Sequence, residues 1–207
     1  MKIYSDLSSY VGELDSAGRR QGFGTMRWAD ESCFAGRHCL VGFWAEDEAC
    51  GYGLLTLASQ ANFEGQWRHS RACGFGVYQT EDCRFEGEWE DDRLHGNGFE
   101  FWKDGAYYIG GYVAGQRHGH ATAVLGNGTK YEGQFEGGKA CGFGRLRYPN
   151  GDLYEGHFRA NMRYGQGRVM YSSGEVLEGD WIEDVLQADT PLITPSRFSP
   201  NKGFLIN

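Results

Sequence analysis

The sequence predicts an all-β protein, a single-layer elongated antiparallel sheet of tandem β-hairpins. A frame of alternating aromatic and glycine residues carries this prediction: Tyr131, Gly133 and Phe135 are followed by the same frame 23 residues later. A Gly-x-Gly pair follows most copies of the frame. The 207 residues include 33 glycines, 15% aromatic residues and only 4 prolines, which suits a glycine–aromatic sheet better than a two-layer core. Self-similarity at a fixed period indicates a repeat architecture.

The frame can be followed along nearly the whole chain. Copy five departs from it, because Gly119 and His120 are not followed by the second glycine of Gly-x-Gly. Copy one is longer than the period, and its surplus falls around residues 29–39, where either the turn bulges or a small extra hairpin forms. The third frame position is glycine in every copy: Gly12, Gly42, Gly65, Gly87, Gly110, Gly133, Gly156 and Gly179.

The residues of one copy explain why it forms a hairpin. Tyr131, Gly133 and Phe135 are two apart, so on a strand they share one face, while Glu132 and Gln134 face the other. That alternation suits a sheet with one wet face. Glycine inside a strand weakens it, so its repeated use needs a reason. We expect the glycines to provide room for a neighbouring aromatic ring to lie flat.

Three segments are predicted along the chain. Residues 1–9 form a capping strand, residues 10–186 form seven and a half repeats, and residues 187–207 form a proline-containing tail. Roughly fifteen strands spaced ~4.8 Å apart would give a rod about 70 Å long. The tail either folds back over the last hairpins or serves as a free linear motif. Thr190, Thr194 and Ser199 each precede a proline and are candidate phosphorylation sites.

The frame resembles the MORN (membrane occupation and recognition nexus) repeat, which reads roughly Tyr-Glu-Gly-x-Trp-x-x-Gly-x-x-His-Gly-x-Gly. The resemblance covers about residues 10–181 and is specific because the motif recurs. It implies a row of hairpins in one long twisted sheet, and a scaffold or binding module rather than a catalyst. It also implies an association with cytoskeletal or membrane-proximal structures.

The sequence gives no support for an enzyme, a cofactor or a metal. It contains no nucleophile elbow, phosphate loop or His-Glu-x-x-His motif. The Gly-x-Gly pairs lack the helix and third glycine of a dinucleotide fingerprint. Cys50, Cys73, His95, His118 and Cys141 precede such pairs. Equivalent positions in successive hairpins are about 10 Å apart, too far to share one zinc ion or a disulfide. We therefore expect free thiols.

Charge and hydropathy restrict the partners and the location. The net charge of −8 argues against binding nucleic acid, which needs a cationic surface. No apolar stretch approaches the ~20 residues of a membrane span. The amino terminus does not resemble a signal peptide, so a cytoplasmic location is expected.

An aromatic stripe along one face of the predicted sheet is the candidate binding groove. Leaving such rings in water is costly, and exposed apolar stripes usually mark protein contacts. The partner would be a helix, another copy of the protein or its own tail, and acidic residues such as those in 86–92 favour one with basic residues. A homodimer is also plausible through the unpaired terminal edge. The groove residues are Phe63, Trp67, Phe85, Trp89, Tyr108, Tyr112, Tyr131, Phe135, Tyr154 and Phe158.

The alternative is a module that binds phosphoinositides or other membrane lipids. The carboxyl-terminal third is the most basic region of the chain. Because the chain as a whole is acidic and anionic lipids attract polybasic segments, lipid binding is the second hypothesis. The candidate lipid contacts are Arg145, Arg147, Arg159, Arg163 and Arg168.

Overall fold

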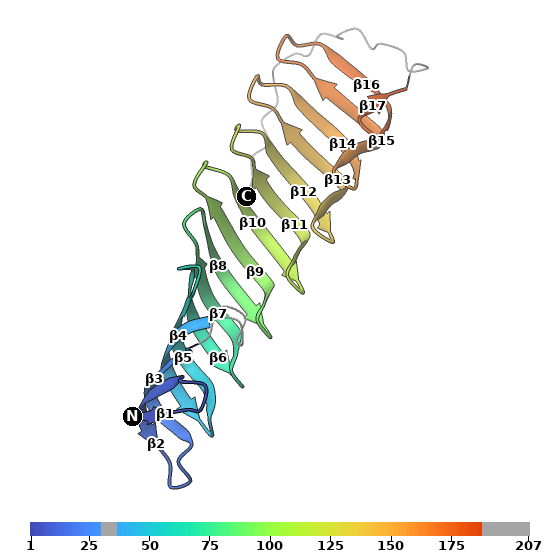
Figure 1. Cartoon of the computed structure of the whole chain (residues 1–207). Helices are drawn as coiled ribbons and strands as arrows, with labels where there is room; N and C mark the ends of the chain where they lie inside the picture. The colour runs from blue at the N-terminus through green and yellow to red at the C-terminus, as the bar shows by residue number, and fades with distance from the viewer. Residues whose placement is uncertain (30–36, 188–207) are drawn as a thin grey trace, which may run out of the picture.

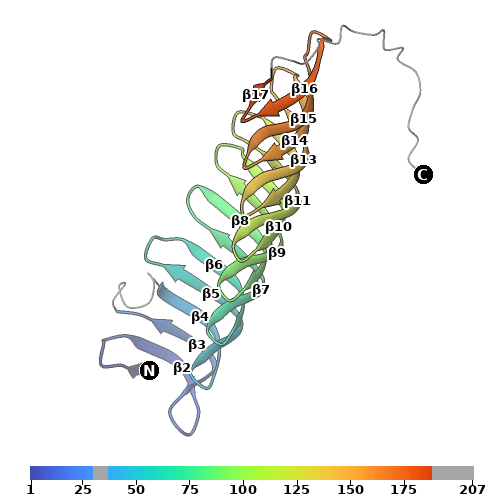
Figure 2. The same ribbon diagram turned by 90° about the vertical axis from the view of Figure 1, so that its right-hand side faces the viewer.

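The computed structural model describes residues 1–29 and 37–187. In these residues the chain has no helix, and 17 strands form one antiparallel sheet. Figures 1 and 2 show this sheet as a long, twisted single layer. The predicted all-β class and single-layer architecture are confirmed.

The strands have the following bounds: β1 (Lys2–Ile3), β2 (Ser9–Leu14), β3 (Arg20–Arg27), β4 (Arg37–Ala45), β5 (Glu48–Leu57), β6 (Asn62–Arg68), β7 (Arg71–Gln79), β8 (Cys83–Glu90), β9 (Arg93–Trp102), β10 (Tyr107–Val113), β11 (Gln116–Val124), β12 (Lys130–Glu136), β13 (Lys139–Arg147), β14 (Leu153–Arg159), β15 (Met162–Met170), β16 (Val176–Ile182) and β17 (Val185–Leu186).

Each strand pairs with the strands before and after it in the sequence, so the order in the sheet is the order in the chain. At the amino-terminal end, β1 lies beside β2 with Lys2 opposite Tyr10. At the other end, β17 pairs with β16 only through Leu186 and Val185. Residues 30–36, which include most of the surplus of copy one, and the tail 188–207 lie outside the described residues.

Glycines of neighbouring strands face one another and form a ladder across the sheet, in which one position from β2 to β16, Ala121, is not a glycine. A Cβ on Gly76 would lie 2.5 Å from Cε2 of Phe63, and one on Gly65 would lie 2.7 Å from the same ring. The expectation that the glycines make room for flat-lying rings is therefore confirmed. The ladder runs through Gly12, Gly24, Gly42, Gly53, Gly65, Gly76, Gly87, Gly98, Gly110, Ala121, Gly133, Gly144, Gly156, Gly167 and Gly179.

The rings that cover this ladder form the core. The ring of Tyr131 makes an edge-to-face contact with Phe135 of its own strand, at 5.2 Å between centroids, and with Phe158 of the next repeat, at 5.0 Å. Similar contacts recur along the sheet, and Tyr10, Tyr108 and Tyr154 are completely buried. Interlocking aromatic side chains thus replace the second layer that most sheets require. We call this side of the sheet the aromatic face and the opposite side the outer face.

Two-residue turns inside the repeats connect each hairpin to the preceding one. Asp91 and Asp92 both have positive φ angles, as a type I′ hairpin turn requires. The N–H of Asp92 donates to the carbonyl of Ala72 at 3.1 Å, and its Oδ1 accepts the N–H of Ala72 at 2.8 Å. Asn161 makes the same pair of bonds with Ala140, at 3.0 and 2.7 Å.

Two turns near the middle of the rod have only half of this connection. The N–H groups of Gly115 and Gly138 donate to the carbonyls of Leu94 and Arg117, at 2.8 and 3.0 Å. A glycine has no side chain to accept the N–H that returns from the preceding hairpin. The hydrogen-bonded connection between hairpins is therefore weakest in this part of the sheet.

We predict that Gly76→Ala lowers the free energy of unfolding by about 1–3 kcal/mol, because its Cβ overlaps the ring of Phe63. Denaturant unfolding followed by circular dichroism measures the change. Phe75→Ala, one residue away on the outer face and half exposed, is the control and should change stability by no more than about 0.5 kcal/mol. Equal effects of the two substitutions would contradict the role of the glycine ladder.

We also predict that Gly138→Asn stabilises the protein by about 1 kcal/mol. Its φ of +77° is close to the +73° of Asn161, and no atom lies within 4 Å of the added Cβ. The new Oδ1 would accept the N–H of Arg117, as Asn161 does for Ala140. Gly138→Ala, which is strained at this φ and adds no acceptor, should instead destabilise the protein in the same thermal or denaturant assay.

Candidate functional site

The predicted groove residues form the core of the aromatic face. Nine of the ten are buried, with exposed fractions of 7% or less, and Trp89 is half-buried. Their edges and faces cover one another, which sequence periodicity alone does not predict. A partner on this face can therefore reach only its pockets and rims.

One pocket of about 340 Å³ opens on the aromatic face, from β11 to the turn that follows β14. Three of the predicted groove residues, Tyr131, Phe135 and Phe158, lie in its lining. Leu125, in the turn before β12, also lines it and is 57% exposed. Arg117 contributes the positive charge of the lining.

The phenol groups of the core tie the rings to the backbone. Oη of Tyr131 donates to the carbonyl of Gln134 at 3.0 Å, and Oη of Tyr154 donates to that of His157 at 3.0 Å. Burial raises the pKa of Tyr154 to about 12, although the nearby Arg163 opposes the change. Burial likewise raises the pKa of Tyr108 to about 12. These hydroxyls are neutral hydrogen-bond donors at neutral pH, so they hold the rings in place.

A charged pair interrupts the aromatic face in the middle of the rod. Glu100 lies between Phe85 and Tyr108 in the sheet register. Its Oε2 is 2.6 Å from Nη2 of Arg117, whose guanidinium lies 4.5 Å above the centroid of Tyr108. Burial opposes the charge of Arg117, but Glu100 more than compensates and raises its pKa. In a later repeat the position equivalent to Glu100 holds the apolar residue Leu146. A glutamate at a position that is apolar elsewhere was the sequence signal for this pair, and it was missed.

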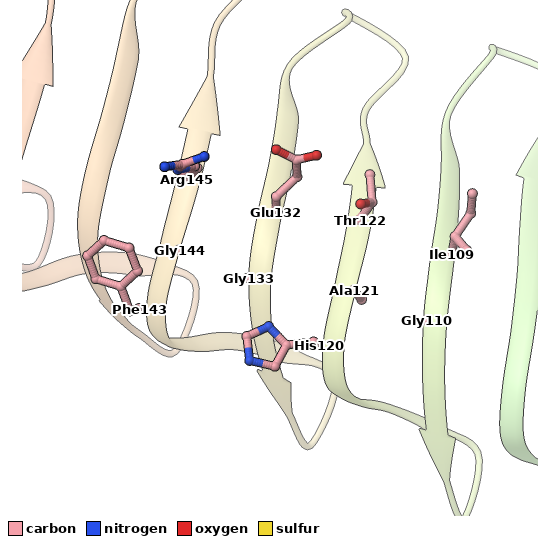
Figure 3. Close-up of a pocket in the computed structure, with 10 residues that line it drawn as sticks. All are labelled: Ile109, Gly110, His120, Ala121, Thr122, Glu132, Gly133, Phe143, Gly144 and Arg145. Carbon is pink, nitrogen blue, oxygen red and sulfur yellow. The ribbon is translucent and has the colours of Figure 1, made fainter. Parts of the chain in front are cut away.

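The outer face carries a larger hollow, of about 580 Å³, over β10 to β13. Its floor is the glycine ladder, and side chains rise on both sides of it (Figure 3). Phe143 and His120 stand on one side, and the other side is formed by Ile109, Thr122, Glu132 and Arg145.

The polar walls of this hollow are paired with their own neighbours. Oε1 of Glu132 is 2.6 Å from Nζ of Lys130. Nε of Arg145 is 2.8 Å from Oε1 of Glu155. Their charges are thus compensated within the sheet.

Large aromatic side chains are exposed on the outer face, which sequence alternation predicted to be polar. Phe23, Phe43, Tyr52, Phe75 and Phe143 are each about half exposed. Four of these five lie between the two glycines of a Gly-x-Gly pair, and Phe43 pairs with Phe23 across the strands. The central residue of Gly-x-Gly was therefore the signal for this surface.

The five arginines predicted to contact lipid do not form one cationic patch. Arg145 and Arg168 both bind the carboxylate of Glu155, at 2.8 and 2.6 Å. The position of Arg163, opposite Phe158, is on the aromatic face, where its guanidinium stacks 4.1 Å above Trp181. The other two, Arg147 and Arg159, lie on the outer face. Lipid binding stays a prediction.

Within residues 1–29 and 37–187, no three His, Cys, Asp or Glu side chains lie close enough together to hold a metal ion. The five cysteines in these ranges are free thiols, and Cys33 lies outside them. The described part of the chain contains no helix long and apolar enough to cross a membrane. The candidate phosphorylation sites Thr190, Thr194 and Ser199 lie outside the described residues.

Comparisons with known proteins agree with the repeat register. A family model described as MORN repeat matches residues 10–33, 41–61, 63–82, 85–107, 108–130, 131–153 and 154–176. The comparison with curated proteins gives no match.

Several solved structures are similar to the chain. The TCP domain of Drosophila melanogaster SAS-4 (dCPAP), in complex with a proline-rich motif of Ana2 (dSTIL), shares 10% identity over 86% of this chain and 93% of that domain, with a TM-score of 0.46. The TCP10 domain of Danio rerio CPAP, in complex with a STIL peptide, shares 16% identity over 86% and 92%, with a TM-score of 0.30. Because both TM-scores are below 0.5, the peptides bound by those domains do not identify a ligand for this chain.

We predict that Glu100→Ala costs about 2–3 kcal/mol of stability, because it leaves the guanidinium of Arg117 without its partner. The cost stays below that of a fully buried pair because Arg117 is 30% exposed. Replacing both residues with leucine, which other repeats carry at equivalent positions, should recover most of the loss. Denaturant unfolding of the wild type and both variants measures this, and a double variant no more stable than Glu100→Ala would contradict it.

Proposed function

Since the chain belongs to the MORN repeat family, we propose that it is a non-catalytic scaffold that binds a protein segment on its aromatic face. The observation that supports this most directly is the pocket lined by Tyr131, Phe135 and Phe158. A hollow opens here beside three of the sequence-predicted groove residues, whose rings are themselves buried.

The rim and the ends of this pocket suit a peptide side chain. Leu125 is 57% exposed at the rim, so covering the rest of it with a partner would contribute about 1–2 kcal/mol. Arg117 and Asn161 place polar groups around the apolar lining. Both side chains are already oriented in the unbound protein, since Arg117 binds Glu100 and Oδ1 of Asn161 accepts the N–H of Ala140 at 2.7 Å. A preformed apolar pocket with a few fixed polar groups is typical of a recognition site.

The lining of the pocket supports binding rather than catalysis. No carboxylate, histidine or cysteine belongs to it, so it offers no acid–base pair and no activated nucleophile. The net charge of −8 favours a partner with basic residues beside its apolar anchor. Such a charge pattern raises the association rate and the specificity more than the affinity.

Leu125→Asp tests the proposal without disturbing the core, because Leu125 lies in an exposed turn. The full-length wild type, Leu125→Asp and the outer-face variant Phe143→Asp would serve as baits in cell extract, followed by quantitative mass spectrometry. We expect a protein that the wild type and Phe143→Asp retain and Leu125→Asp loses by roughly tenfold.

The retained protein would then be purified and its Kd measured with all three baits. Unchanged circular dichroism of Leu125→Asp serves as the control for folding. A partner whose Kd is the same for the wild type and Leu125→Asp would contradict binding in this pocket.

A further inference from the structure

The amino-terminal half of the outer face carries a second, separate apolar surface. Two rows of side chains flank the glycine ladder there, one residue before and one residue after each glycine. Val41, Val77 and Phe99 in these rows are partly buried. The six other apolar members are between 40% and 56% exposed, although they lie in regular strands. They define the outer patch, which consists of Val11, Phe23, Phe43, Tyr52, Leu54 and Phe75.

The charges among these two rows from β2 to β9 are all negative. They are the carboxylates of Glu13, Glu64, Glu86 and Glu88, and neither row contains a lysine or arginine. Glu86 has a cation beside it, since its Oε1 is 2.6 Å from Nε of Arg84.

The other three carboxylates form no ion pair with the described residues. Oε1 of Glu64 accepts the phenol hydrogen of Tyr52 at 2.7 Å. Oε1 of Glu88 accepts the N–H of Asn97 at 3.1 Å. Glu13 lies over Gly22, next to Phe23. Neutral donors leave the negative charge uncompensated, so the outer patch combines exposed rings with an anionic field.

Strands β12 to β15 of the same face differ in this respect. There Glu155 binds both Arg145 and Arg168, and Glu132 binds Lys130. Around the hollow of Figure 3 the charges are paired within the sheet. The carboxylates around the hollow therefore have cations within the sheet, whereas Glu64 and Glu88 in the amino-terminal half form no ion pair with the described residues.

The hydrogen bonding of the sheet backbone favours one secondary structure for a bound partner segment. Strands β3 to β7 under the outer patch are paired on both sides, so their N–H and C=O groups are already used in the ladder. Only β2, at the edge of the patch, has a second partner for no more than Ser9 and Tyr10. An extended peptide pressed onto this face would lose water from its own backbone and gain no hydrogen bond in return. An α-helix satisfies its backbone internally, and a helix on a sheet is the usual second layer.

We propose that the outer patch binds an amphipathic helix whose apolar stripe covers the exposed rings and whose lysine or arginine side chains reach Glu64 and Glu88. The distance from β2 to β8 is six strand spacings, or about 29 Å, which a helix of about 19 residues spans. A second copy of this chain fits less well, because its net charge of −8 would repel the anionic patch.

The test uses the full chain and two synthetic amphipathic helices of about 18 residues, one of leucine and lysine and one of leucine and glutamate. Fluorescence anisotropy of labelled peptide gives Kd at low and raised salt. We expect the wild type to bind the lysine peptide, with affinity falling as salt rises, and not the glutamate peptide.

Variants locate the binding on the protein. Phe43→Ser/Phe75→Ser should weaken binding of the lysine peptide at least about tenfold, since each ring would lose its burial. Glu64→Gln/Glu88→Gln preserves shape and should weaken binding and reduce its salt dependence. Phe143→Ser, equally exposed on the other half of the face, and Leu125→Asp in the aromatic-face pocket should bind as the wild type does.

Equal binding by the wild type and both double variants would overturn the proposal, as would equal binding of the two peptides. A concentration-dependent dimer in light scattering that Phe43→Ser/Phe75→Ser abolishes would also overturn it, by assigning the outer patch to a second copy. Because Leu125→Asp is carried in the same assay, failure here is distinguishable from failure of the proposed aromatic-face pocket.

Discussion

The contact between an aromatic ring and the backbone of two glycines determines the rest of the structure. The ring of Phe63 lies where side chains of Gly65 and Gly76 would otherwise project, one on its own strand and one on the next. A slip of one residue in the pairing of β6 with β7 would put a residue with a side chain in the place of Gly76 and turn the buried side chains of one strand to the outer face. The same contact therefore fixes the register, brings the rings of successive repeats together and closes a core in a protein with one layer.

The period and the alternation in Tyr131, Gly133 and Phe135 were enough to predict the strands, their order and the use of glycine as space. The burial of the rings was not predictable, because it depends on how neighbouring repeats bring their edges and faces together. For the same reason the aromatic-face pocket was predicted only through three members of its lining. The exposed rings of the outer face were missed because the alternation was taken from the first strand of the repeat, where Glu132 and Gln134 face outward. The second strand places an aromatic residue, Phe143, between paired glycines.

The middle of the rod departs from the repeat in several independent ways. Ala121 interrupts the glycine ladder, Glu100 and Arg117 bring charge into the aromatic face, and Gly115 and Gly138 have no side chain to connect adjacent hairpins. In a repeat protein each unit contacts only its neighbours, so stability is a sum of local terms. We expect these local changes to divide the rod into two more cooperative halves that join between β9 and β13.

The order of strands also has a mechanical consequence. Every strand is attached only to the strands before and after it in the chain, and no later segment in the described residues returns to clamp an earlier one. Tension applied at one end of the rod would therefore peel hairpins off singly rather than rupture the whole sheet. Each released repeat would lengthen the tether by roughly 80 Å of extended chain. A scaffold of this kind would unfold one hairpin at a time under tension and refold in the reverse order when the tension falls.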